Sequence, residues 1–140
     1  MKKTICVLLF LFPFLLLATE FKDVIWHRCY DGDTCTFTIH GVQPIFGDKI
    51  GIRLAGIDTP EIRGQCPEEK QKAIEARDFL VQLLENAEEI ILAEAERGKY
   101  FRLVAVIYAD GVNLNEEMVR AGHAVPYDGD TKKHDWCSED

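Results

Sequence analysis

Short apolar runs, separated by turn-forming residues, account for most of the chain. In residues 34–40, Thr36 and Thr38 alternate with Phe37 and Ile39, as expected for a strand with one buried face. Comparable runs predict further strands at 24–30, 50–56, 88–94 and 101–109. The pattern therefore indicates a fold built on five strands.

Two segments have helical spacing instead. Small and apolar residues recur along one face of residues 68–85, at Ala73, Ala76, Leu80 and either Leu83 or Leu84. A shorter helix is predicted over 113–120. Loops are predicted at 41–49, 61–67 and 95–100. Five strands with a helix after the third match the outline of the OB-fold, so we predict an α+β domain: a five-stranded OB-fold β-barrel with packed helices.

Two acidic residues open the longer predicted helix. Glu68 and Glu69 lie in its first turn, where negative charge is favourable at the positive end of the helix dipole. We interpret both as helix electrostatics and not as metal ligands.

Residues 1–19 have the pattern of a secretory signal peptide. Lys2 and Lys3 precede an uncharged run over 5–17, and the small residue Ala18 follows it. The run is too short for a comfortable membrane span; a retained anchor is the alternative. We expect cleavage, a single domain over residues 20–140, a periplasmic or secreted location, no stable membrane association and a monomer.

Acidic residues outnumber basic ones. The 16 Lys and Arg residues stand against 24 Asp and Glu residues, a formal net charge of −8. Loss of Lys2 and Lys3 with the leader removes two positive charges and makes the net charge −10. An acidic protein has no long-range attraction for nucleic acid. A phosphate-ester substrate would have to be held locally, by arginines and a metal ion.

Four cysteines follow the leader: Cys29, Cys35, Cys66 and Cys137. An even number in an exported chain predicts two disulfides, for which three pairings exist; the alternative is four free thiols, which is favoured further if the chain is not exported. Cys29 and Cys35 flank the Asp31-Gly32 hairpin signal between the first two strands, whose Asp31 we interpret as a turn residue. We therefore predict Cys29–Cys35, which leaves Cys66–Cys137.

Residues 52–61 combine groups that suit chemistry on a phosphate. Arg53 lies in an apolar run, and Asp58 and Glu61 follow the point where that run breaks. Oxygen ligands hold hard cations, and arginine makes paired hydrogen bonds to phosphate oxygens. Asp33, at the end of the predicted hairpin, would supply a third carboxylate.

Each of these groups also has a structural interpretation. Arg53 and Asp58 would form a salt bridge, with Thr59 as the N-cap of a helix that begins at Pro60. Arg102 is the only charge in the apolar run 101–109, and a lone arginine entering a buried strand is more often structural than catalytic.

Taken together, the motifs resemble one family. In order they are Asp31-Gly32-Asp33-Thr34, the run from Arg53 to Glu61, Lys99-Tyr100-Phe101-Arg102, the strand end at Tyr108–Gly111, and Asn115-Glu116 through Gly122. Over about residues 24–127 this set is similar to the staphylococcal nuclease (thermonuclease) family. The resemblance implies an OB-fold enzyme that hydrolyses phosphodiesters in DNA and RNA with one Ca²⁺. It also implies cleavage on the 5′-oxygen side, which leaves 3′-phosphate ends.

The resemblance also implies roles for individual residues. The metal ligands would be Asp33, Asp58 and the backbone carbonyl of Thr59. The catalytic residues would be Glu61, as general base, and the phosphate-binding Arg53 and Arg102. The nucleotide would lie beside Tyr100 and, in a looser match, Tyr127.

The chain departs from the family at three points. Phe101 replaces the glycine usual before the second arginine, the chain is acidic where the founding member is basic, and the tail after Tyr127 is too short for the usual final helix. Two other functions stay open: a non-catalytic OB-fold module that binds nucleic acid or protein, and a small disulfide-stabilised structural or inhibitory protein.

Overall fold

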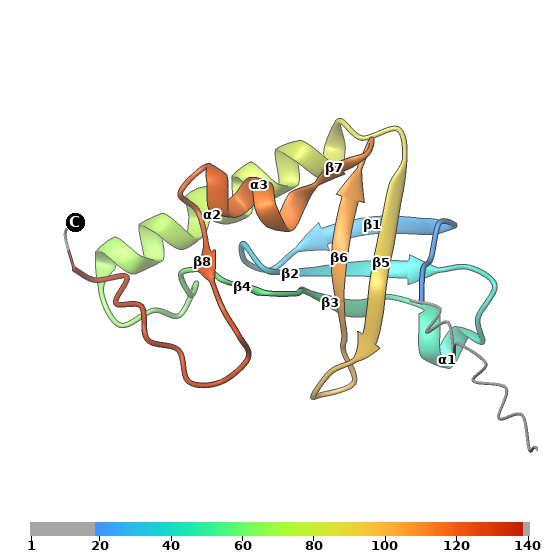
Figure 1. The fold of residues 1–140 in the computed structure, drawn as a ribbon, viewed down its shortest axis with the longest axis horizontal. Coiled ribbons are helices and arrows are strands. Elements are labelled where there is room, and N and C mark those ends of the chain that lie inside the picture. The colour runs from blue at the N-terminus through green and yellow to red at the C-terminus, as the bar shows by residue number, and fades with distance from the viewer. Residues whose placement is uncertain (1–18, 139–140) are drawn as a thin grey trace, which may run out of the picture.

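The main sheet has the strand order β1-β2-β3-β6-β5 in the computed structural model, which describes residues 19–138 (Figure 1). All but the last residue of the predicted signal peptide therefore lie outside the described residues. The strands are β1 Val24–Cys29, β2 Thr34–Ile39, β3 Ile50–Leu54, β5 Ile90–Arg97 and β6 Leu103–Ala109. Short β7, Val112–Asn113, pairs with β6, and β4, Ile57–Asp58, pairs with β8, Val125–Pro126.

The sheet curls so that its two ends approach each other. Its neighbouring strands are antiparallel except for the parallel pair β3–β6. Just before β1, the Phe21 amide donates to the Leu92 carbonyl of β5 at 2.8 Å, and the Leu92 amide donates back at 2.9 Å. This bridge links the chain ahead of the first strand to the strand at the other end of the order. The predicted α+β fold with an OB-type barrel is therefore confirmed.

Two helices lie together on one side of the barrel (Figure 1). They are α2, Pro67–Glu85, and α3, Leu114–Arg120. The buried positions of α2 include Ala73, Ala76, Leu80 and Leu84, so the predicted stripe is confirmed and uses Leu84.

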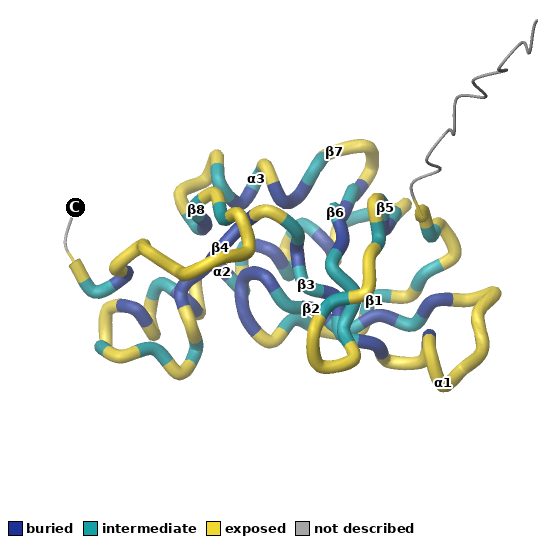
Figure 2. The backbone as a smooth tube through the Cα atoms, turned by 60° about the horizontal axis from the view of Figure 1, so that its bottom comes forward, coloured by how far each residue is buried: buried dark blue, intermediate teal, exposed yellow. Residues whose placement is uncertain are grey.

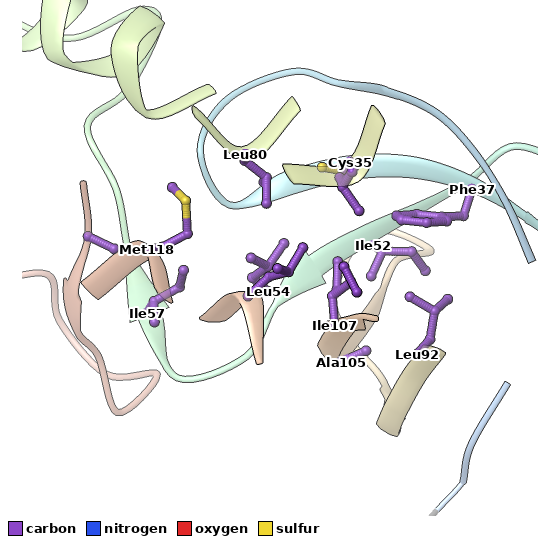
Figure 3. Close-up of a cluster of buried hydrophobic side chains, with 14 of the residues drawn as sticks. Cys35, Phe37, Ile52, Leu54, Ile57, Leu80, Leu92, Ala105, Ile107 and Met118 are labelled. Carbon is purple, nitrogen blue, oxygen red and sulfur yellow. The ribbon is translucent and has the colours of Figure 1, made fainter. Parts of the chain in front are cut away.

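The core lies between these helices and the curled sheet. Figure 3 shows Leu80 and Met118 from the helices facing Leu54 and Ile107 from the strands. Each of these four side chains is fully buried, and burial of a large aliphatic side chain contributes about 1.5–3 kcal/mol.

Three boundaries differ from the sequence prediction. The segment 41–49, predicted as a loop, contains a short helix, α1 Pro44–Gly47, because proline is well accommodated at the first helical position. Strand β5 continues to Arg97, past a register shift between Ala93 and Glu96. Strand β6 begins at Leu103, so Arg102 lies in the turn that precedes it.

The helix that was considered at Pro60 is absent. The described chain between β4 and α2 is a loop, and α2 starts seven residues later, at Pro67. Its N-cap is Cys66, whose sulfur accepts a hydrogen bond from the Glu69 amide at 3.3 Å. Thr59 is therefore not an N-cap.

Gly32 lets the β1–β2 turn pack closely against the rest of the domain. A Cβ atom at this position would lie 2.8 Å from Ala76 Cβ, 3.1 Å from Thr59 Cγ2 and 3.2 Å from Met118 Cε. Any side chain here would therefore push the turn away from α2, α3 and the loop after β4. The glycine brings the two aspartates of the turn next to that loop.

Both predicted disulfide pairs, Cys29–Cys35 and Cys66–Cys137, are bonded. After β8 the chain forms a segment, residues 127–135, which is exposed from Asp128 onward and which we call the strap (Figure 2). The strap ends at buried Trp136, next to the second disulfide. Within residues 19–138 no helix follows α3. None of the described helices is both long and apolar enough to cross a membrane.

Candidate active site

Asp33 and Arg53 meet at the ends of neighbouring strands. The register of β2 and β3 pairs Thr34 with Arg53, and the Leu54 amide donates to the Asp33 carbonyl at 2.8 Å. Arg53 Nη1 then lies 2.5 Å from Asp33 Oδ1. Asp33 is only 2% exposed, so the guanidinium provides the charge that a buried carboxylate requires.

Gly56 turns the chain so that Asp58 approaches the same arginine. Simple strand alternation would place Arg53 and Asp58 on opposite faces. Gly56 has φ +72°, a conformation that costs other residues energy, and it ends the regular path of β3. As a result Arg53 Nη2 donates to the Ile57 carbonyl at 3.2 Å and lies 4.0 Å from Asp58 Oδ1. The salt bridge considered from the sequence is therefore present, alongside the closer pair with Asp33.

Asp58 and Thr59 are both buried, at 3% and 1% exposure. Asp58 belongs to β4, which is held by its pairing with β8. Its Oδ1 atom has no hydrogen-bond donor among the described residues. Lys132 Nζ lies 2.6 Å from this oxygen, but not along a direction that makes a hydrogen bond. The contact is therefore an ion pair only.

Glu61 is held in place through its backbone amide, and its side chain is half exposed. Glu69 Oε1 accepts a hydrogen bond from the Glu61 amide at 3.2 Å, and Glu69 Oε2 accepts one from the Gln65 amide at 2.8 Å. Glu69 is buried and so fixes the loop that carries Glu61. Glu61 Oε1 lies 2.5 Å from Lys132 Nζ.

Lys132 is the shared cation of the two carboxylates. Burial alone lowers the pKa of its ammonium, but its hydrogen bond to Glu61 and the negative charges of Asp58 and Glu61 outweigh burial and raise the pKa overall. Lys132 is therefore charged at neutral pH.

Asp31 also belongs to the acidic group. Its Oδ1 accepts a hydrogen bond from the Asp33 amide at 3.2 Å, which supports the turn role predicted for it. The turn is buried, however, and burial together with the charge of Asp33 raises the pKa of Asp31 to about 7. A proton on Asp31 relieves the repulsion between two neighbouring aspartates.

A cavity of about 770 Å³ opens beside these groups. Its lining includes five positively charged residues: Arg53, Arg97, Lys99, Arg102 and Lys132. Glu61 and Asp128 are its acidic residues. A chain with a net charge of −8 thus gathers positive charge where an anionic substrate would bind.

Arg102 lies over the backbone of β3. A Cβ atom at Gly51 would lie 3.2 Å from Arg102 Cγ, so the glycine leaves room for the arginine stem. Arg102 Nε is buried and has no hydrogen-bond partner among the described residues. Arg102 also lines the cavity, where a guanidinium is suited to bind an anion.

The two tyrosines assigned to the nucleotide occupy different positions. Tyr127 lines the cavity, and its ring lies 5.9 Å from Arg53 Cζ. Tyr100 is 88% exposed, with its ring 5.8 Å from Arg102 Cζ. Phe101, which replaces the usual glycine, has φ +57° and lies exposed with its ring 4.9 Å from Arg97 Cζ.

The donor set fits a hard cation. Asp58 Oδ1 is a buried oxygen without a hydrogen bond, and a positive charge, the Lys132 ammonium, already lies between Asp58 and Glu61. Carboxylate and carbonyl oxygens are the ligands that Ca²⁺ prefers.

A second cluster does not bind metal. Among residues 19–138, Cys66, Glu69 and Cys137 place three ligand atoms within 4.8 Å of one another. Both sulfurs belong to a disulfide and are not available as thiolate ligands.

The chain matches the model of the staphylococcal nuclease homologue family over residues 51–138. It belongs to the staphylococcal nuclease family. The matched span covers Arg53, Asp58, Glu61 and Arg102, whereas Asp33 lies ahead of it. The resemblance inferred from the motifs is therefore confirmed.

Several relatives are named as endonucleases. A protein from Escherichia coli O157:H7, called an uncharacterized endonuclease, is 30% identical over 130 residues, which cover 91% of this chain and 75% of the relative. One of the same description from Haemophilus influenzae is 33% identical over 97 residues, 69% of this chain and 48% of the relative. A probable endonuclease LCL3 from Phaeosphaeria nodorum is 33% identical over 84 residues, 57% and 28% of the two chains.

Sequence reasoning missed Lys132, the buried position of Asp31, and the hydrogen bonds of Glu69 and Asn115. Asn115 Nδ2 donates to the Ala55 carbonyl at 2.8 Å, and its Oδ1 accepts from the Ile107 amide at 3.0 Å. The Asn115-Glu116 motif signalled that this position is special, but not that it anchors the turn at Gly56. No local pattern marked Lys132.

Proposed function

We propose that the protein is an exported, Ca²⁺-dependent nuclease that hydrolyses phosphodiester bonds in DNA and RNA with little sugar specificity and leaves 3′-phosphate ends. The observation that carries the proposal is the shared cavity. Arg53, Glu61 and Arg102 line it, and the carboxylate oxygens of the buried Asp33 and Asp58 lie 2.5 and 4.0 Å from the Arg53 guanidinium. Family membership and the relatives named as endonucleases support the same reaction class.

Each residue has a role that its position permits. Arg102 lines the cavity and would bind the phosphate oxygens through its guanidinium. Arg53 lines the same cavity while it holds the two aspartates in place. Glu61, half exposed at the cavity wall, accepts a proton from the attacking water. Tyr127 covers Arg53 and offers its ring to a nucleotide.

Asp33, Asp58 and the carbonyl of Thr59 would hold the cation, with Glu61 nearby. When bound, a divalent cation supplies positive charge that offsets the charge developing on the phosphate in the transition state. No cysteine thiolate or histidine belongs to this set, which disfavours zinc. Mg²⁺ demands stricter octahedral geometry than Ca²⁺, so we expect it to support cleavage poorly.

Export is proposed from the leader and the disulfides. Residues 1–19 have the signal-peptide pattern, and two disulfides persist best in an oxidising compartment. Mass spectrometry of protein recovered from the culture medium or periplasm would test the cleavage site. A mature chain that still begins at Met1 would contradict it.

The decisive assay incubates purified protein with single-stranded DNA and with RNA, in Ca²⁺, in Mg²⁺ or in chelator. We expect cleavage of both substrates with Ca²⁺, slow cleavage with Mg²⁺ and none in chelator. Glu61→Gln should lower the turnover rate far more than it weakens nucleotide binding, whereas Glu68→Gln, at an exposed helix position, should change neither. Binding without cleavage under all conditions would favour the non-catalytic OB-fold module.

A further inference from the structure

The strap is attached to the rest of the domain through its backbone at its two ends. At its start the Tyr127 amide donates to the Gly56 carbonyl at 2.8 Å. At its far end Lys72 Nζ donates to the Trp136 carbonyl at 3.2 Å, and Cys137 is bonded to Cys66. In the described part of the chain, no backbone–backbone hydrogen bond joins residues 128–135 to the barrel or the helices. This middle section can therefore shift without any loss of barrel hydrogen bonds.

The strap carries one positive charge inward. Residues 128–135 are all exposed, yet the Lys132 ammonium lies 2.6 Å from Asp58 Oδ1 and 2.5 Å from Glu61 Oε1. Lys133 is exposed and makes no ion pair among residues 19–138. Two adjacent lysines of equal charge thus have different environments.

We infer that Lys132 is an internal cation at the divalent-ion position between Asp58 and Glu61, and that an incoming ion displaces it. The inference rests on the proposed function, because it takes these carboxylates as part of the metal site. It assigns to the strap a role in setting the affinity of the site for Ca²⁺.

The geometry favours replacement of the Lys132 ammonium by a divalent ion over permanent occupation of the site by the lysine. The contact with Asp58 lies outside hydrogen-bond directions, which is unfavourable for an ammonium group but no obstacle for a spherical ion. A divalent ion carries twice the charge and takes six to eight oxygen ligands. It must nevertheless break two ion pairs before it binds, so the lysine lowers the apparent affinity.

The same contacts explain how the acidic group is stable before an ion arrives. Asp33 is neutralised by Arg53, and Asp58 and Glu61 share Lys132. Without that ammonium, two carboxylates would face each other with only the more distant Arg53 to offset their charge.

Calcium titration calorimetry on the chelator-treated full-length protein tests the inference. Three forms are compared: wild type, Lys132→Gln and Lys133→Gln. We expect Lys132→Gln to bind Ca²⁺ about tenfold more tightly or better, because the competing charge is gone. Lys133→Gln loses the same charge from the next position. Its Ca²⁺ affinity should stay within about twofold of wild type, since solvent and salt screen the interaction between an exposed lysine and the bound ion.

A second measurement needs no substitution. Limited acetylation followed by peptide mass spectrometry reports how accessible each lysine is in the wild-type protein. We expect Lys132 to react several-fold faster in saturating Ca²⁺ than in chelator, because the ion releases its ammonium. The reaction of Lys133 should be unchanged between the two conditions.

The outcomes separate the inference from the proposed function. If wild type binds Ca²⁺ and cleaves nucleic acid, but Lys132→Gln binds no more tightly or Ca²⁺ does not change Lys132 labelling, the inference is wrong and the nuclease stands. A raised KM with unchanged Ca²⁺ affinity would make Lys132 a phosphate ligand and would also overturn the inference. If no form binds Ca²⁺ and none cleaves, both proposals fail.

Discussion

Arg53 Nη1 and Asp33 Oδ1 lie 2.5 Å apart, and the side chains are 18% and 3% exposed. Replacing Arg53 by Gln leaves Asp33 buried without its charge partner. Because an unpaired buried charge is costly, we expect the free energy of unfolding to fall by about 3 kcal/mol. Urea denaturation measures this loss. The control is Arg77→Gln, which breaks an exposed pair with Asp78 and should cost less than about 1 kcal/mol; equal losses would show that the Arg53 pair is not special.

Arg102 is expected to act on substrate and not on stability. Arg102→Lys keeps the charge but loses the planar paired donors, so kcat/KM should fall at least about tenfold, or about 1.4 kcal/mol in the barrier. The midpoint of urea unfolding should barely move. Arg63→Lys, at an exposed position in the loop before α2, is the control for general loss of arginine. If the variant unfolds, or if its turnover is normal, Arg102 has a structural role and does not bind the substrate.

Asp31 makes stability depend on pH. Its pKa is raised to about 7 in the folded protein from an ordinary value of 3.8, so the unfolded chain loses the proton first as pH rises. Stability is therefore lost progressively between about pH 4 and pH 7 and stays reduced above pH 7. Asp31→Asn keeps an oxygen that can accept the hydrogen bond from the Asp33 amide. It also removes the titrating carboxyl group and, with it, this loss of stability.

We expect Asp31→Asn to raise the free energy of unfolding by a few kcal/mol at pH 8 and by much less near pH 4. Both measurements belong in chelator, so that no bound cation offsets the carboxylate. Asp23→Asn, at an exposed position, should show no such pH-dependent gain. A constant difference between Asp31→Asn and wild type across this range would contradict the raised pKa.

The two disulfides should differ in how much they stabilise the fold. Cys66 and Cys137 are 71 residues apart in sequence, whereas Cys29 and Cys35 are six apart. The chain-entropy relation gives about 4 kcal/mol for the long loop and about 2 kcal/mol for the short one, as upper values. Urea unfolding of Cys66→Ser/Cys137→Ser and of Cys29→Ser/Cys35→Ser would measure both. A larger loss from the short pair would contradict the relation here.

The barrel was predictable because its signals are local. Alternation in β2, the helical stripe of α2 and the Asp-Gly turn each depend on residues close together in sequence. The proximity of Arg53 to Asp58 was harder to predict from the sequence, since it depends on the positive φ of Gly56.

Other features depend on contacts between distant segments. Asp31 was correctly interpreted as a turn residue, but its burial arises because Gly32 lies against Ala76, Thr59 and Met118. The position of Lys132 depends on β8 and on a disulfide to Cys66, while residues 131–135 have no regular secondary structure. Because such a segment has no helical or strand periodicity, its position could not be predicted from the sequence.

The parallel pairing of β3 with β6 has a consequence for biogenesis. Ile52 is paired with Leu103, so about fifty residues must be synthesised after β3 before its second edge is covered. Until then the apolar strand Ile50–Leu54 has free backbone groups on one side and is open to pairing with other chains. A nascent chain that stalls or is truncated before β6 should therefore aggregate, and a chaperone that shields residues 50–54 would help the protein most at that stage.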